Sequence, residues 1–111
     1  MKITTEDHEQ VSVMTLKGEL ASEAVESLRR TAQERLDNKV RDIVLDCAAL
    51  ETIDSRGLEA LLWLQEQCGE RLGQIRLAGA SESMEKILEM TRLASRLDRH
   101  PDVDTALRSL R

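Results

Sequence analysis

The chain has 111 residues, of which 41% are hydrophobic and 33% are charged, and its formal net charge is −5. This length suits one domain built around a single core, spanning residues 1–111. The net negative charge argues against binding to the phosphate backbone of nucleic acids, because such binding requires a basic face. Trp63 is the only aromatic residue, so stacking platforms for bases are absent as well. We therefore expect no nucleic acid partner.

No segment approaches the roughly 18 consecutive apolar residues of a membrane span, and the first residues lack the apolar stretch of a secretory signal. We therefore expect a cytoplasmic protein without direct membrane insertion. Two cysteines, Cys47 and Cys68, are too few for a disulfide framework. Small buried cysteines pack like apolar residues, so both are expected as free thiols.

The first third of the chain predicts a hairpin followed by a helix. A weak strand is expected over 2–6 and a better one over 11–17, joined by a polar connection. After Gly18 the apolar residues change to helical spacing, which predicts a helix from about Ser22 to Asp37. Its apolar stripe consists of Val25, Leu28, Ala32 and Leu36.

The remaining chain alternates between strand and helix patterns. We expect a buried strand over 41–46, a loop over 47–53 and a long central helix over 55–68. The later elements are a strand at 74–78, a helix at about 83–91, a weak strand at 96–99 and a helix after Pro101. This order predicts an α/β fold with a mixed sheet of four to five strands, about four helices and right-handed crossovers.

The segment Ile53-Asp54-Ser55-Arg56-Gly57-Leu58 lies where a buried strand and loop lead into the central helix. At a helix N-terminus, unpaired backbone N–H groups and the helix dipole favour an oxygen acceptor or a negative charge. The Ser55 hydroxyl therefore has two interpretations, as a helix cap or as a phosphate acceptor. A phosphate would add about −1.5 to −2 charges without disrupting the helix.

On the central helix, Trp63 is predicted to lie outside the core face. At helical spacing the apolar face contains Leu58, Leu61, Leu62 and Cys68, with Leu64 at its margin. Trp63 instead falls among Glu59, Glu66 and Gln67, which makes it a candidate contact residue because tryptophan is enriched in interface hot spots. The alternative is that its ring lies against a neighbouring loop or its own helix.

The residue patterns of enzymes are absent. His8 and His100 lie in terminal segments, are expected at the surface, and have no metal-binding spacing to the cysteines. Ser55 lacks the Gly-x-Ser-x-Gly elbow of a hydrolase, and the five glycines form no phosphate-binding loop. We therefore expect a protein that is not an enzyme, with no catalytic residue, no metal ligand and no cofactor.

Several motifs, taken in order, resemble the STAS domain of bacterial anti-sigma-factor antagonists. They are the strand ending in Leu16-Lys17-Gly18-Glu19-Leu20, the strand Ile43-Val44-Leu45-Asp46, the Ile53–Leu58 segment with its leucine-rich helix, and Ile75-Arg76-Leu77-Ala78-Gly79. The Gly-Glu-Leu and Asp-Ser-x-Gly-Leu signatures are specific in combination. The resemblance covers nearly the whole chain and implies a STAS-like α/β domain.

In that family, an anti-sigma factor that is an ATP-dependent serine kinase phosphorylates the serine after the aspartate, and a phosphatase removes the phosphate. The resemblance implies that Ser55 is the phosphoacceptor. It also implies that Asp54, Gly57 and the Gly18-Glu19-Leu20 turn lie in the partner-binding surface, which we extend to Arg56 and Trp63. The unphosphorylated form would bind the kinase, which then releases its sigma factor.

Two residues depart from the family pattern. Ala21 replaces an aspartate that often follows Gly-Glu-Leu, and Arg56 stands where a small residue usually follows the serine. Both departures are compatible with a different kinase or with no kinase. The alternative function is a constitutive accessory subunit of an ABC-transporter ATPase or a signalling scaffold, because STAS-like proteins also serve in those assemblies.

Overall fold

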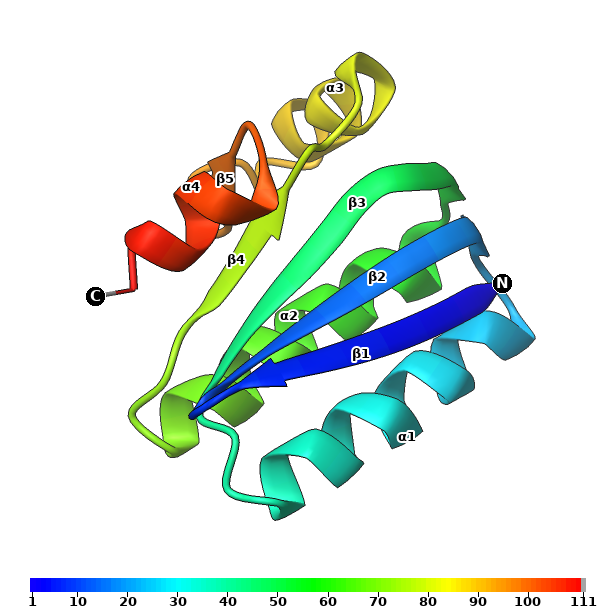
Figure 1. The fold of residues 1–111 in the computed structure, drawn as a ribbon. Helices are drawn as coiled ribbons and strands as arrows, with labels where there is room; N and C mark the ends of the chain where they lie inside the picture. Colours follow the sequence, from blue (N-terminus) through cyan, green and yellow to red (C-terminus); the bar gives the residue numbers. More distant parts are fainter. Residues whose placement is uncertain (111) are drawn as a thin grey trace.

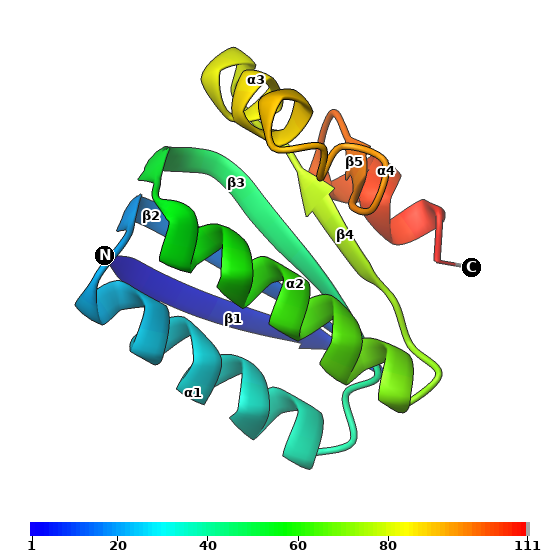
Figure 2. The same cartoon turned by 180° about the vertical axis from the view of Figure 1, so that it is seen from behind.

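A computed structural model describes residues 1–110 and shows a five-stranded sheet with helices on both of its faces (Figures 1 and 2). The strand order is β1-β2-β3-β4-β5, with β1 antiparallel to β2 and the other neighbours parallel. The elements are β1 (Lys2–His8), β2 (Val11–Leu20), α1 (Glu23–Asp37), β3 (Asp42–Ile53), α2 (Ser55–Glu70), β4 (Ile75–Ala78), α3 (Glu82–Met90), β5 (Asp98–His100) and α4 (Val103–Arg108). The predicted α/β class with a mixed sheet is confirmed.

The main core lies between the sheet and helices α1 and α2, which run side by side over one face (Figure 2). On β2, Met14 and Leu16 are fully buried on that face. The other face of β2 carries Val13, which joins Val44 and Ala78 in a smaller cluster under α4. Because α4 has only six residues, it covers part of that face and leaves β1 open there (Figure 1).

The predicted loop over 47–53 is wrong, because β3 continues as a strand to Ile53. Its first half pairs with both neighbours, whereas β4 pairs only with Ile43–Asp46, so the second half pairs with β2 alone. The pairing with β2 shifts register twice in this half, and Figure 1 shows the strand bending as it extends. The shifts break the two-residue alternation that would have revealed a strand in the sequence.

The helix faces agree with the sequence prediction at most positions. On α2, however, Leu64 is fully buried and Leu62 is only half-buried, so the core face is rotated toward Leu64. Leu61, Leu64 and Cys68 follow the i, i+3, i+7 spacing of one helix face, so the spacing itself places Leu64 in the core and Leu62 at the margin. As predicted, Cys47 and Cys68 are buried free thiols. Burial raises the pKa of each thiol to about 12, with nearby Asp46 and Asp42 adding to the effect.

His8 is exposed as predicted, whereas His100 is half-buried and its Nε2 atom has no hydrogen-bond partner among residues 1–110. The difference arises because His100 belongs to the edge strand β5, which pairs it with Ala78 of β4. Over the described residues, no helix is both long enough and apolar enough to cross a bilayer.

Candidate functional site at the start of α2

The C-terminal ends of β2 and β3 meet the first turn of α2 at one end of the sheet. Glu19 pairs with Thr52 and Leu20 pairs with Ile53, so the two parallel strands end together. The Asp54 amide then donates a 3.3 Å hydrogen bond to the Leu20 carbonyl oxygen. The Gly18-Glu19-Leu20 motif is thereby fixed next to the Asp54-Ser55 motif.

Gly57 allows the helix to start this close to β2. A β-carbon on Gly57 would lie 2.5 Å from the Leu20 carbonyl oxygen and 2.7 Å from Cγ1 of Ile53. Both distances are far below normal contact, and the Leu20 oxygen belongs to the backbone of a buried residue. Gly57 is itself buried, so it positions the site and offers no side chain to a partner.

The helix cap is Asp54 and not Ser55. The Asp54 carboxylate accepts a 2.9 Å hydrogen bond from the Gly57 amide, and its extended backbone is typical of an N-cap residue. Ser55 is the first helical residue, its side chain is exposed, and its hydroxyl forms no hydrogen bond within residues 1–110. The capping interpretation of Ser55 is therefore wrong, and its hydroxyl faces solvent at the positive end of a 16-residue helix.

Arg56 gives this site an unusual charge. The first turn of α2 contains no acidic residue, and Arg56 is exposed there. It forms no ion pair with the residues that the structure describes. Because the dipole places partial positive charge at a helix N-terminus, a cation there is unfavourable by a few tenths of a kcal/mol. The Asp54 carboxylate at the N-cap supplies the negative charge that this helix end favours.

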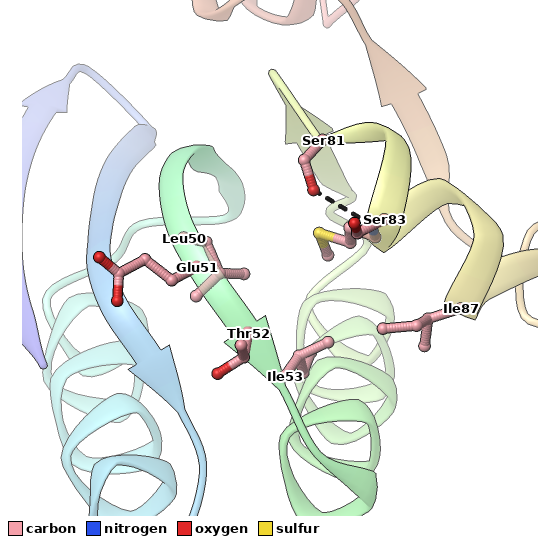
Figure 3. Close-up of a pocket in the computed structure, with 8 residues that line it drawn as sticks. Leu50, Glu51, Thr52, Ile53, Ser81, Ser83 and Ile87 are labelled. Carbon is pink, nitrogen blue, oxygen red and sulfur yellow. Dashed lines mark hydrogen bonds between the residues drawn. The ribbon is translucent and has the colours of Figure 1, made fainter.

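Two concave regions flank the start of α2, one lined by Ile53 and the other by Arg56. One is a cavity of about 270 Å³ between the end of β3 and α3, where Leu50 and Ile53 point toward Ile87 (Figure 3). Ser81, whose side chain caps α3, is uncharged and lies at the rim of this cavity. The second is a cleft of about 250 Å³ between α1 and α2, lined by Ser22, Val25, Glu26, Arg29, Arg56 and Glu59. Neither region was predicted from the sequence.

Trp63 lines the same hollow as Glu59 and Glu66, in agreement with the prediction, but it is half-buried and not exposed. The guanidinium of Arg29 on α1 lies 5.1 Å from the centre of its ring. This distance is within the range of a cation–π interaction. The side-by-side packing of α1 and α2 therefore covers one side of the indole, a contact between two elements that sequence spacing alone does not reveal.

The predicted site residues thus form one cluster and one separate position. The cluster lies at the C-terminal ends of β2 and β3 and consists of Glu19, Asp54, Ser55 and Arg56. Asp54 is half-buried, and the other three are exposed. Trp63 lies eight residues along α2 from Ser55, a rise of about 12 Å along the helix. Among residues 1–110, no group of three histidine, cysteine, aspartate or glutamate side chains is arranged to hold a metal ion.

Comparison with known proteins agrees with this geometry. The family model of the STAS domain matches residues 2–106. The chain therefore belongs to the STAS domain family. A search among curated proteins found no significant match.

Solved structures with the same fold include anti-sigma factor antagonists and a sulfate transporter family protein. The chain is 24% identical to an anti-sigma factor antagonist from Mycobacterium paratuberculosis, with a TM-score of 0.86 over 98% of this chain and 92% of that one. It is 22% identical to the phosphorylated form of SpoIIAA, a Bacillus cell fate determinant, with a TM-score of 0.78 over 99% and 100% of the two chains. A sulfate transporter family protein from Wolinella succinogenes is 20% identical, with a TM-score of 0.81 over 93% and 86%. At these identities the likeness defines the fold.

Proposed function

We propose that this protein is a cytoplasmic anti-sigma-factor antagonist, a non-enzymatic module that binds an anti-sigma factor with serine kinase activity. Unphosphorylated Ser55 permits binding, and phosphorylation of Ser55 releases the partner. A phosphatase then restores the binding form. In this scheme Glu19, Asp54 and Arg56 contribute to the contact surface, and Gly57 sets its shape.

The observation that carries the proposal is the free Ser55 hydroxyl. Because Asp54 already caps α2, Ser55 has no structural task and is open to a kinase. A phosphate there would meet the positive end of the helix dipole and the Arg56 side chain, so the fold would tolerate it. The added bulk and charge would lie on the surface where Glu19 and Arg56 are exposed.

Phosphopeptide analysis of the protein from its native cells tests the modification directly. Trypsin cleavage after Arg41 and Arg56 releases a peptide whose only hydroxyl side chains are Thr52 and Ser55. We expect a phosphorylated form of this peptide, with fragment ions that place the phosphate on Ser55 and not on Thr52. A peptide that stays unmodified under all growth conditions, or carries its phosphate on Thr52, would contradict the proposal.

A second candidate function is a constitutive accessory subunit of an ABC-transporter ATPase or a signalling scaffold. Arg56 favours it, because a cation already occupies the first turn of α2 and would partly neutralise an added phosphate. In that case Ser55→Asp would leave the assembly intact, whereas Trp63→Ala would weaken it. The opposite pattern would exclude the accessory-subunit function.

A further inference from the structure

The outer surface of α2 carries a stripe of four residues at helical spacing: Glu59, Leu62, Trp63 and Glu66. Positions i, i+3, i+4 and i+7 lie on one side of a helix. Figure 2 shows α2 with α1 beside it and no helix or strand over the side that faces away from the sheet. The stripe is two turns long, with exposed glutamates at its ends and partly accessible apolar side chains between them.

The stripe forms one wall of a hollow of about 490 Å³, completed by Gln65 and Arg96. Leu62 and Trp63 are half-buried apolar side chains at its centre, and the two glutamates at its ends are exposed. Gln65 donates a hydrogen bond to the Arg96 carbonyl oxygen, which fixes the opposite wall to the helix. An apolar centre between charged ends is the usual composition of a protein interface.

Trp63 is held in place before any partner binds. Arg29 lies 5.1 Å from the ring centre, so the indole is restrained from the α1 side while the rest of the ring lines the hollow. A side chain that is already ordered loses little conformational entropy on binding. Tryptophans in this situation are typical anchors of interfaces.

The two glutamates place an acidic charge at each end of the stripe, with Arg96 on the opposite wall and Arg29 beside Trp63. Glu59 and Glu66 form no ion pair within the described chain, and Arg96 supplies the only opposing charge among the lining residues, so their sum is −1. The glutamates are seven residues apart, a rise of about 10.5 Å. A second helix with lysine or arginine at positions i and i+7 has the same spacing between its cations.

We infer that the Glu59–Leu62–Trp63–Glu66 stripe is a docking site for an amphipathic helix of a partner protein, apolar at its centre with a basic residue at each end. The stripe extends the proposed binding surface, on which this inference rests, because Glu59 lines both this hollow and the cleft beside Arg56. Ser55 does not line the hollow, so this contact holds a partner in a manner independent of the phosphate.

A fluorescence titration tests the inference without knowledge of the partner. Trp63 is the only aromatic residue, so its emission reports on the hollow alone. The probe is an alanine-rich helical peptide without aromatic residues, with two leucines at its centre and lysines at i and i+7. A second peptide carries glutamates in place of the lysines. We expect the lysine peptide to cause a saturable change in Trp63 emission. The glutamate peptide should bind at least tenfold more weakly.

Charge reversal supplies the decisive comparison. The double variant Glu59→Lys/Glu66→Lys should reverse the peptide preference: it should bind the glutamate peptide and no longer bind the lysine peptide. The matched control, Glu82→Lys/Glu89→Lys, reverses two exposed glutamates with the same spacing on α3 and should behave as wild type. Equal affinity for both peptides, no response to either, or an unchanged preference in the Glu59/Glu66 variant would overturn the inference.

The titration is also independent of the phosphoswitch. Ser55→Asp should bind the lysine peptide as tightly as wild type does, because residue 55 is outside the hollow. Failure of the proposed function at Ser55 would leave this result unchanged, and failure of the docking site would leave phosphorylation of Ser55 unchanged. Loss of the lysine peptide in Ser55→Asp would contradict the separate docking site.

Discussion

Gly57 approaches Leu20 so closely that a β-carbon on the glycine would lie 2.5 Å from the Leu20 carbonyl oxygen. This contact joins the first turn of α2 to the end of β2, and the Asp54 amide strengthens the junction by donating to the same oxygen. The exposed Ser55 hydroxyl owes its position to this buried junction. The surface motif and the packing motif are therefore parts of one structural unit.

Gly57→Ala should destabilise the fold, because the added methyl group meets backbone that cannot move aside. Overpacking of this kind costs about 1–3 kcal/mol of unfolding free energy, which exceeds the helix-propensity gain of at most about 1 kcal/mol. Gly69→Ala is the matched control on the same helix, since its β-carbon would meet nothing within 4 Å. It should stabilise by about 0.5–1 kcal/mol. Urea unfolding of both variants measures the difference, and equal effects would refute the close approach.

Asp54→Ala should lower the unfolding free energy by about 1 kcal/mol, because it removes the side-chain acceptor of the Gly57 amide. Ser81→Ala, which removes the cap of α3, should cost a similar amount. Ser55→Ala should change stability by less than about 0.5 kcal/mol, as expected for an exposed residue without a hydrogen bond. A larger loss in Ser55→Ala than in Asp54→Ala would show that the serine is the cap after all.

Cys47 and Cys68 should resist alkylation in the native state. Their pKa values of about 12 keep both thiols protonated near neutral pH, and both side chains are buried. Iodoacetamide labelling followed by mass spectrometry should therefore proceed at the rate of global unfolding and accelerate in urea. Fast labelling of either thiol in native protein would contradict the packing of β3 or α2.

The raised pKa values of the same two thiols should lower the unfolding free energy at alkaline pH. Each has a folded-state pKa above the unfolded value of about 9, so above that pH the unfolded chain releases protons that the folded chain retains. Ionisation then favours the unfolded state, and unfolding free energy should fall as the pH rises from 9 toward 12. Replacing both cysteines with alanine should flatten this part of the profile, as measured by urea unfolding at each pH.

The fold was largely predictable from the sequence because most elements have clear periodicity, such as the Val25, Leu28, Ala32 and Leu36 stripe of α1. The second half of β3 could not be predicted, because its two register shifts break the alternation of buried and exposed residues and β4 does not pair with it. Strand pairing supplies the stabilisation there, and pairing is a tertiary property.

The candidate site was predictable only in part. The motif placed Ser55 at the start of a helix, but position alone did not show which of two adjacent polar residues forms the cap. Asp54 does so because its backbone is extended where the chain leaves β3. The Arg29–Trp63 contact depends on how two helices pack, which sequence spacing does not determine. The α2 stripe was not predicted, because Leu62 was expected on the core face and the structure leaves it only half-buried.

Affinity capture from the native cell, with the wild-type protein and three variants as baits, tests the phosphoswitch most directly. Wild type and Ser55→Ala should recover an ATP-dependent serine kinase, identified by mass spectrometry, whereas Ser55→Asp should not. Ser83→Asp places the same charge on an exposed serine in the first turn of α3 and should behave as wild type. Equal recovery of one partner by wild type, Ser55→Ala and Ser55→Asp would contradict a phosphorylation-gated antagonist.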